Sequence, residues 1–285
     1  DIHNPNSETT AHGSVLAQGG AQGGNGGQIE TSGHSIDIDG FRADTRSASD
    51  SLGKTGLWLI DPYDYTIGLS QALTIGSNLN TSDVTVTTTA NNTSFGATGS
   101  GLGNITVNSE ISKTGSAATT LTLSAANQIS VLSNIRTTAG VLNLVLNAQG
   151  GQSVVTGTLT LGSGSLTKQG GGALALLSSN NYSGGTTVSA GTLGLYNNTA
   201  AGTGAIALGH NTSLLLGRTV TQVANNISLG GTATIGLDSA IDFLVVGGGG
   251  GGGTRAGGGG GGGNVARGSM VPAFILGNTL FVTVG

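Results

Sequence analysis

Four aspartates near the start of the chain are the residues most suggestive of chemistry, because clustered carboxylates can bind Ca²⁺. They are Asp37, Asp39, Asp44 and Asp50. The EF-hand pattern is missing, and the glycine runs of the chain lack the aspartates of calcium-binding nonapeptide repeats. We therefore expect solvated carboxylates on an outer face of the protein and no metal site.

Nucleotide binding and nucleophilic catalysis have weaker signals. The triplet Gly53-Lys54-Thr55 would complete a phosphate-binding P-loop only with a glycine five residues before Gly53, and that residue is Ala48. The histidines are scattered, at His3, His12, His34 and His210. No G-x-S-x-G elbow is present either. We expect no cofactor and no catalytic triad.

The composition predicts the kind of element that must position these side chains. The chain has 285 residues, with 55 glycines and 8% charged residues, against about 7% glycine and about 25% charged residues in average domains. Disordered chains carry more charge and fewer β-branched residues, so ordered β structure with many turns is favoured. The 9 Lys and Arg give no basic surface for nucleic acid, and no apolar run is long enough for membrane insertion.

Short apolar strands recur from Gly68 to Leu237, 15 to 21 residues apart, with turn residues between them. They are Val84–Val86, Ile105–Val107, Leu121–Leu123, Leu142–Leu144, Leu159–Leu161, Leu174–Leu176, Leu193–Leu195 and Leu214–Leu216. One such coil cannot bury its own apolar face and must stack on its neighbours, which predicts a solenoid. No helical periodicity extends over a dozen residues. We therefore expect an all-β protein built as a parallel β-helix.

The aromatic residues Trp58, Tyr63 and Tyr65 could form a platform for a sugar ring. Packing in the core or cap near one end of the solenoid is the interpretation we favour. The chain has no cysteine, which excludes a disulfide framework. It begins at Asp1 without Met or a signal peptide, and we interpret it as a processed piece of a longer protein.

Two segments resemble known families. GGNGGQIETSG (residues 23–33), followed by an alternating strand and by GKTGLWLIDPYDYTI (residues 53–67), resembles the large secreted adhesins of the filamentous-haemagglutinin type. The segment from Leu166-Thr167-Lys168 to Gly191-Thr192-Leu193 is similar to the autotransporter-associated β-strand repeat of bacterial surface proteins. Both resemblances imply a right-handed parallel β-helix on a secreted protein.

The texture changes at Ile241. Phe243, Leu244, Val245 and Val246 lead into seven glycines, Gly247 to Gly253, and after Thr254-Arg255-Ala256 come seven more, Gly257 to Gly263. This segment resembles glycine-rich domains of bacterial and phage surface proteins. The glycines are either a flexible linker or polyproline-II-like (polyglycine-II) arms covered by other backbone. We expect Phe243–Val246 to pair with Phe281–Val284.

These observations predict three parts: residues 1–67 as a haemagglutinin-type β-helix start, 68–240 as β-helix repeats, and 241–285 as the glycine-rich module. We expect an extracellular, non-catalytic rod for adhesion or matrix, assembling into a filament through solenoid ends and glycine arms, with a surface glycan or receptor as partner. The expected assembly residues are Phe243, Leu244, Val245, Val246, Gly247, Gly253, Gly257, Gly263, Phe274, Ile275, Leu280, Phe281, Val282 and Val284. A phage tail-fibre tip is an alternative. A carbohydrate-active β-helix enzyme is a second one, for which residues 68–237 offer only Asp83 and Glu110 as carboxylates in their main part.

Overall fold

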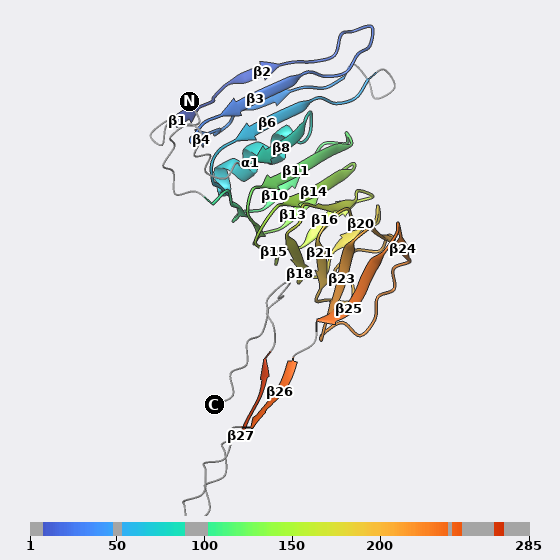
Figure 1. The fold of residues 1–285 in the computed structure, drawn as a ribbon. Helices are drawn as coiled ribbons and strands as arrows, with labels where there is room; N and C mark the ends of the chain where they lie inside the picture. The colour runs from blue at the N-terminus through green and yellow to red at the C-terminus, as the bar shows by residue number, and fades with distance from the viewer. Residues whose placement is uncertain (1–7, 48–52, 89–101, 239–240, 247–264, 271–285) are drawn as a thin grey trace, which may run out of the picture. The chain divides into compact units, whose positions relative to one another are not determined.

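The computed structural model describes residues 8–47, 53–88, 102–238, 241–246 and 265–270. The chain divides into two compact units, Asp1–Gly236 and Leu237–Gly285. The first unit is a β-solenoid of parallel strands with about nine turns, since its longest sheet has nine strands and each turn contributes one (Figure 1). The prediction of an all-β fold of stacked parallel strands is confirmed. The described parts of the predicted segments 1–67 and 68–240 share these sheets.

Two long sheets form two sides of the solenoid. The nine-stranded sheet contains β3 (Gln28–Ser32), β6 (Leu57–Asp61), β8 (Asp83–Thr87), β11 (Thr119–Ala125), β14 (Leu142–Ala148), β17 (Leu166–Gln169), β20 (Thr186–Val188), β22 (Ile206–Leu208) and β24 (Ile227–Leu229). The eight-stranded sheet contains β7 (Tyr65–Ile67), β9 (Ile105–Val107), β12 (Ile129–Val131), β15 (Gln152–Val155), β18 (Ala173–Leu176), β21 (Thr192–Leu195), β23 (Thr212–Gly217) and β25 (Ala233–Asp238).

A third side is shorter and less regular. Its four-stranded sheet contains β10 (Ile111–Lys113), β13 (Ile135–Thr137), β16 (Leu159–Gly162) and β19 (Asn181–Tyr182). Before it come two two-stranded parallel sheets, which pair β1 (Glu8–Thr10) with β4 (Ser35–Asp37) and β2 (Ser14–Leu16) with β5 (Arg42–Asp44). One helix, α1 (Leu69–Asn78), lies between β5 and β10 and contacts both.

The length of a turn differs from the predicted strand spacing. Register partners in neighbouring turns lie between 19 residues apart, for Leu176 and Leu195, and 24 apart, for Ile105 and Ile129. The predicted spacing of 15 to 21 residues was wrong as a turn length, because each turn carries strands on two or three sides. Leu142–Leu144 belongs to the nine-stranded sheet, for example, whereas Leu159–Leu161 belongs to the third side.

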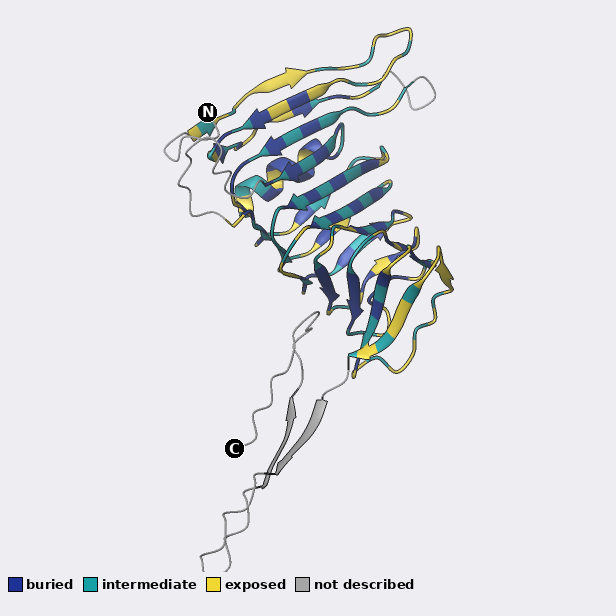
Figure 2. Cartoon of the chain, in the orientation of Figure 1, coloured by how far each residue is buried: buried dark blue, intermediate teal, exposed yellow. Residues whose placement is uncertain are grey.

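The core is a set of aliphatic columns that run along the solenoid. Strands β11 and β14 alternate between buried and half-buried residues, so every second side chain points inward (Figure 2). Their register places Leu121 beside Leu144 and Leu123 beside Leu146, all at most 2% exposed. Each fully buried aliphatic side chain of this kind contributes about 1.5–3 kcal/mol.

Helix α1 takes the place of a third-side strand in its turn. Its inward face carries Thr74 and Asn78, whereas Leu69 and Leu73 are exposed. The prediction that this part of the chain contains only strands was wrong here. The helix has ten residues, fewer than the dozen over which a helical period was sought, and its leucines face outward. No helix among the described residues has the length and apolar character needed to cross a membrane.

The described part of the second unit is one antiparallel pair. Strand β26 (Ile241–Val246) pairs with β27 (Val265–Met270), with Val246 opposite Val265. The chain therefore returns beside itself where residues 247–264 leave it, as expected for a hairpin-like excursion. The returning strand differs from the expected Phe281–Val284, which lies outside the described residues. A return at residue 265 closes a much shorter loop, which costs less conformational entropy.

Candidate functional site

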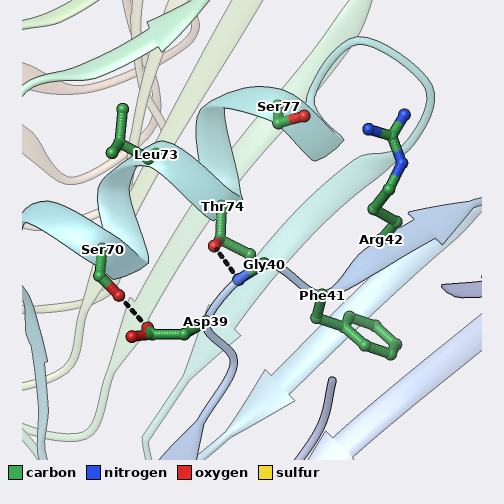
Figure 3. Close-up of a pocket in the computed structure, with 8 residues that line it drawn as sticks. All are labelled: Asp39, Gly40, Phe41, Arg42, Ser70, Leu73, Thr74 and Ser77. Carbon is green, nitrogen blue, oxygen red and sulfur yellow. Dashed lines mark hydrogen bonds between the residues drawn. The ribbon is translucent and has the colours of Figure 1, made fainter. Parts of the chain in front are cut away.

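A groove runs between helix α1 and the segment that joins β4 to β5 (Figure 3). We call it the helix-side groove; its volume is about 410 Å³, and it is lined by Asp39, Gly40, Phe41, Arg42, Ser70, Leu73, Thr74 and Ser77. Residues more than thirty positions apart meet here because consecutive turns of the solenoid stack. It is thus a place where side chains from different parts of the sequence converge.

The floor of the groove is held by helix side chains that act as a strand backbone would. The Thr74 hydroxyl accepts a hydrogen bond from the Gly40 N–H at 3.0 Å. The Asn78 side chain accepts from the Ala43 N–H at 2.6 Å and donates to the Phe41 carbonyl at 2.7 Å. The Phe41 ring packs on Trp58 with centroids 5.2 Å apart. These bonds satisfy backbone groups that a neighbouring strand would otherwise pair.

The open side of the groove combines charge, hydroxyls and an aliphatic surface. Ser70 donates a hydrogen bond to Asp39 at one end, while Arg42 and Ser77 lie toward the other end in Figure 3. Leu73 is 64% exposed between them. The described ion pairs join His12 to Asp37, Arg46 to Asp44 and Arg136 to Glu110. Arg42 therefore has no carboxylate partner among the described residues.

A second, smaller cavity of about 160 Å³ adjoins the groove through the same arginine. Arg42 lines both cavities, and the second one is bordered by Val15 and Leu16 of strand β2, which are 44% and 67% exposed. A guanidinium can bind a carboxylate with two parallel hydrogen bonds. The surface around Arg42 could thus bind an acidic ligand with an apolar face, whose hydroxyls would meet Asp39, Ser70 and Ser77.

The last turn of the solenoid offers a different surface. Ile227 and Leu229 of β24 stand in register with Ile206 and Leu208 of β22, which are buried. In the last turn the same inward positions are 39% and 56% exposed. On β25, Ile235 and Leu237 are 48% and 72% exposed. We call these four residues the bare rung, because among the described residues nothing stacks on them.

The predicted aspartates do not form one cluster. Asp37 accepts a hydrogen bond from the Asp39 N–H at 3.0 Å, which, with the His12 contact, lowers its pKa. Asp44 is paired with Arg46 at 2.6 Å, and Asp50 lies outside the described residues. Across the described ranges, no three His, Cys, Asp or Glu side chains gather where they could share a metal ion.

The other sequence candidates have structural roles. The Lys54 N–H donates to Asn25 at 2.9 Å, so Gly53-Lys54-Thr55 stacks on the preceding glycine turn and leads into a strand. Trp58, Tyr63 and Tyr65 are 0%, 4% and 6% exposed, which confirms core packing and excludes a sugar platform. Asp83 begins β8 of the nine-stranded sheet, whereas Glu110 precedes β10 on the third side.

The predicted assembly residues fall mostly outside the described chain. Phe243, Leu244, Val245 and Val246 lie in β26 and pair with β27. The remaining ones lie in the ranges that are not described: Gly247, Gly253, Gly257, Gly263, Phe274, Ile275, Leu280, Phe281, Val282 and Val284. Their role in assembly stays a prediction.

Sequence reasoning missed the helix-side groove and the bare rung. Arg42 has no pattern around it that marks it, because its partners come from the next turn. The bare rung did have a signal, since Ile227-Ser228-Leu229 repeats the alternation of Ile206-Ala207-Leu208. What the alternation could not show is that this rung is the last one stacked.

Strands β17 to β21 contain a polar set that holds one turn to the next. The Asn180 side chain accepts from the Leu159 N–H at 2.8 Å and donates to the Ala200 carbonyl at 2.7 Å. The Tyr182 and Thr186 hydroxyls are 2.7 Å apart. The Lys168 ammonium donates to the Gln169 and Gly170 carbonyls at 3.1 and 2.6 Å, and burial lowers its pKa to about 8. These side chains are therefore used in stacking.

Residues 166–195 match the family described as the passenger-associated transport repeat. The match begins at the first residue of β17 and ends at the last residue of β21, so it covers a full turn and the next two rungs. Together with the parallel solenoid, it fits a β-helix like that of autotransporter passengers and suggests a secreted or surface protein. No curated protein and no solved structure matches the chain.

Proposed function

We propose that this chain is a non-catalytic, extracellular rod, a right-handed passenger-type β-helix of the adhesin class that attaches a bacterial surface or matrix to acidic glycans. The observation that carries the proposal is the repeat at residues 166–195, which continues the core columns of the solenoid without interruption. Right-handed connection is the rule for parallel strands joined by crossovers. The resemblance of residues 23–67 to haemagglutinin-type adhesins supports the adhesive role.

The conserved-looking polar chemistry of the rod is used for construction. Lys168, Asn180 and Tyr182 are at most 4% exposed and bond to backbone or to neighbouring hydroxyls. Adhesion is assigned to the helix-side groove, where Arg42 offers its guanidinium beside the aliphatic Leu73. A uronic or other acidic sugar presents a carboxylate, hydroxyls and an apolar ring face, which fits this combination. Self-association through the solenoid end and the glycine-rich module completes the proposal.

Binding to immobilised polygalacturonate, with dextran as the neutral polymer, tests the adhesive role. We expect the full chain to bind the acidic polymer and Arg42→Ala to bind it about tenfold more weakly, because hydrogen bonds to charged groups are worth about 1.5–3 kcal/mol. Arg218→Ala removes another exposed arginine and should bind like the wild type. Equal binding to dextran, or equal loss in both variants, contradicts the assignment of the groove.

A further inference from the structure

The two ends of the described solenoid are not equivalent. In the first turns, the inward residues Ile29, Ile36 and Ile38 are 8%, 7% and 0% exposed. Strands β1 and β2, paired with β4 and β5, lie at that end of the chain. At the other end, the bare rung leaves its four aliphatic side chains between 39% and 72% exposed. Repeat proteins normally end in capping units with a polar outer face, so the last turn is built as an interior rung.

The strand edges at this end are also open. Strands β24 and β25 are the terminal strands of the nine- and eight-stranded sheets, so among the described residues each has a sheet neighbour on one side only. Their outer edges present unpaired N–H and C=O groups that can accept another strand. An occupant of this surface must therefore supply both aliphatic side chains and strand edges in the same layer.

We propose that the occupant is the bare rung of a second copy, so that two solenoids join by their C-terminal ends around a twofold axis. The described residues contain one surface of this kind, and it matches itself in shape, polarity and edge hydrogen bonding. Such a contact is isologous and closes after two copies. A head-to-tail contact would instead place the bare rung on the covered first turns, where the core positions are already buried.

This inference deepens the proposed self-association, because it names the end that associates and limits it to a dimer. It is independent of glycan binding, since the helix-side groove is lined by residues 39–42 and 70–77 and the bare rung by residues 227–237. A protein that binds polygalacturonate as a monomer would retain the proposed adhesive role while overturning the dimer.

Sedimentation analysis of the full chain over a wide concentration range tests the dimer. We expect a discrete dimer for the wild type, and a dissociation constant at least tenfold higher for Leu229→Asp and for Ile235→Asp, because a buried unpaired carboxylate is costly. Leu132→Asp and Leu177→Asp are matched controls, since Leu132 and Leu177 are 49% and 43% exposed elsewhere on the solenoid. Both controls should sediment like the wild type.

A single-cysteine label separates the remaining outcomes, and the chain has no cysteine of its own. In Leu229→Cys, the thiol should react rapidly at low protein concentration and slowly once the dimer forms. A thiol that is protected at every concentration in a monomeric protein shows that another part of the chain covers the rung, which overturns the proposal. Open-ended fibres, or a dimer insensitive to Leu229→Asp, overturn it as well.

Discussion

The side-chain oxygen of Asn78 accepts a hydrogen bond from the backbone N–H of Ala43 at 2.6 Å. Through this bond a helix residue completes the pairing of strand β5, where every later turn of the third side uses a strand. The same side chain donates to the Phe41 carbonyl, and Asn78 is only 3% exposed. One amide therefore links the first turns to the rest of the rod.

Asn78→Ala should destabilise the first turns strongly. The change leaves the Ala43 N–H and the Phe41 carbonyl buried without partners, at about 1–3 kcal/mol for each group. Trp58 is the single tryptophan, is fully buried and packs on Phe41, so its fluorescence reports this region during urea unfolding. Ser77→Ala, on the exposed face of the same helix, should leave the midpoint unchanged. Equal midpoints for both variants would show that Asn78 is not a structural link.

The stability of the rod should increase with pH above about 8, owing to its buried lysines. Burial lowers the pKa of Lys168 from 10.5 to about 8 and also lowers that of Lys113. Between about pH 8 and 10.5 the unfolded chain then binds more protons than the folded one, so the unfolding free energy rises with pH. For Lys168 the rise is at most about 3 kcal/mol. Above pH 10 the raised pKa values of Tyr65 and Tyr182, both caused by burial, reverse the trend.

Urea unfolding at pH 7.5, 8.5 and 9.5 measures this dependence. Lys168→Met should flatten the rise and the double variant with Lys113→Met should abolish it, whereas Lys54→Met, at an exposed position, should keep the wild-type slope. A wild-type stability that is constant or falls from pH 7.5 to 9.5 would contradict the linkage.

Two glycines in neighbouring turns should respond oppositely to alanine. A Cβ at Gly164 would lie 1.9 Å from the Leu142 carbonyl oxygen, whereas one at Gly171 meets nothing closer than 3.7 Å. Gly164→Ala forces the turns apart and should cost about 1–3 kcal/mol or more. Gly171→Ala should stay within about 0.5 kcal/mol of the wild type. Thermal unfolding followed by far-UV circular dichroism compares them, and a similar loss in both would show that the turns can separate freely.

The sequence predicted the strands better than their arrangement. Alternating residues such as Leu121 and Leu123 reveal an inward face directly, because the period of a strand is two. They do not reveal which side of the solenoid a strand occupies, and so strands from different sides were counted as one spacing. Helix α1 was missed because its inward face is polar, and Thr74 and Asn78 are explained only by the backbone groups they meet.

The candidate sites were less predictable still. The burial of Trp58 and Tyr65 was foreseen from their place beside a strand, but Arg42 gains its surroundings from residues about thirty positions later. The bare rung differs from a buried rung only in what lies beyond it. Short-range patterns in the sequence contain information about neither.

Stacking in the solenoid has a mechanical consequence. Each turn contacts only the turns on either side, so a force that separates the two ends of the rod removes turns singly from an open end. A released turn of 19 to 24 residues lengthens the chain by about 60–85 Å. The rod therefore yields in steps and recovers by restacking one turn at a time, which makes it a tether that absorbs load without parting.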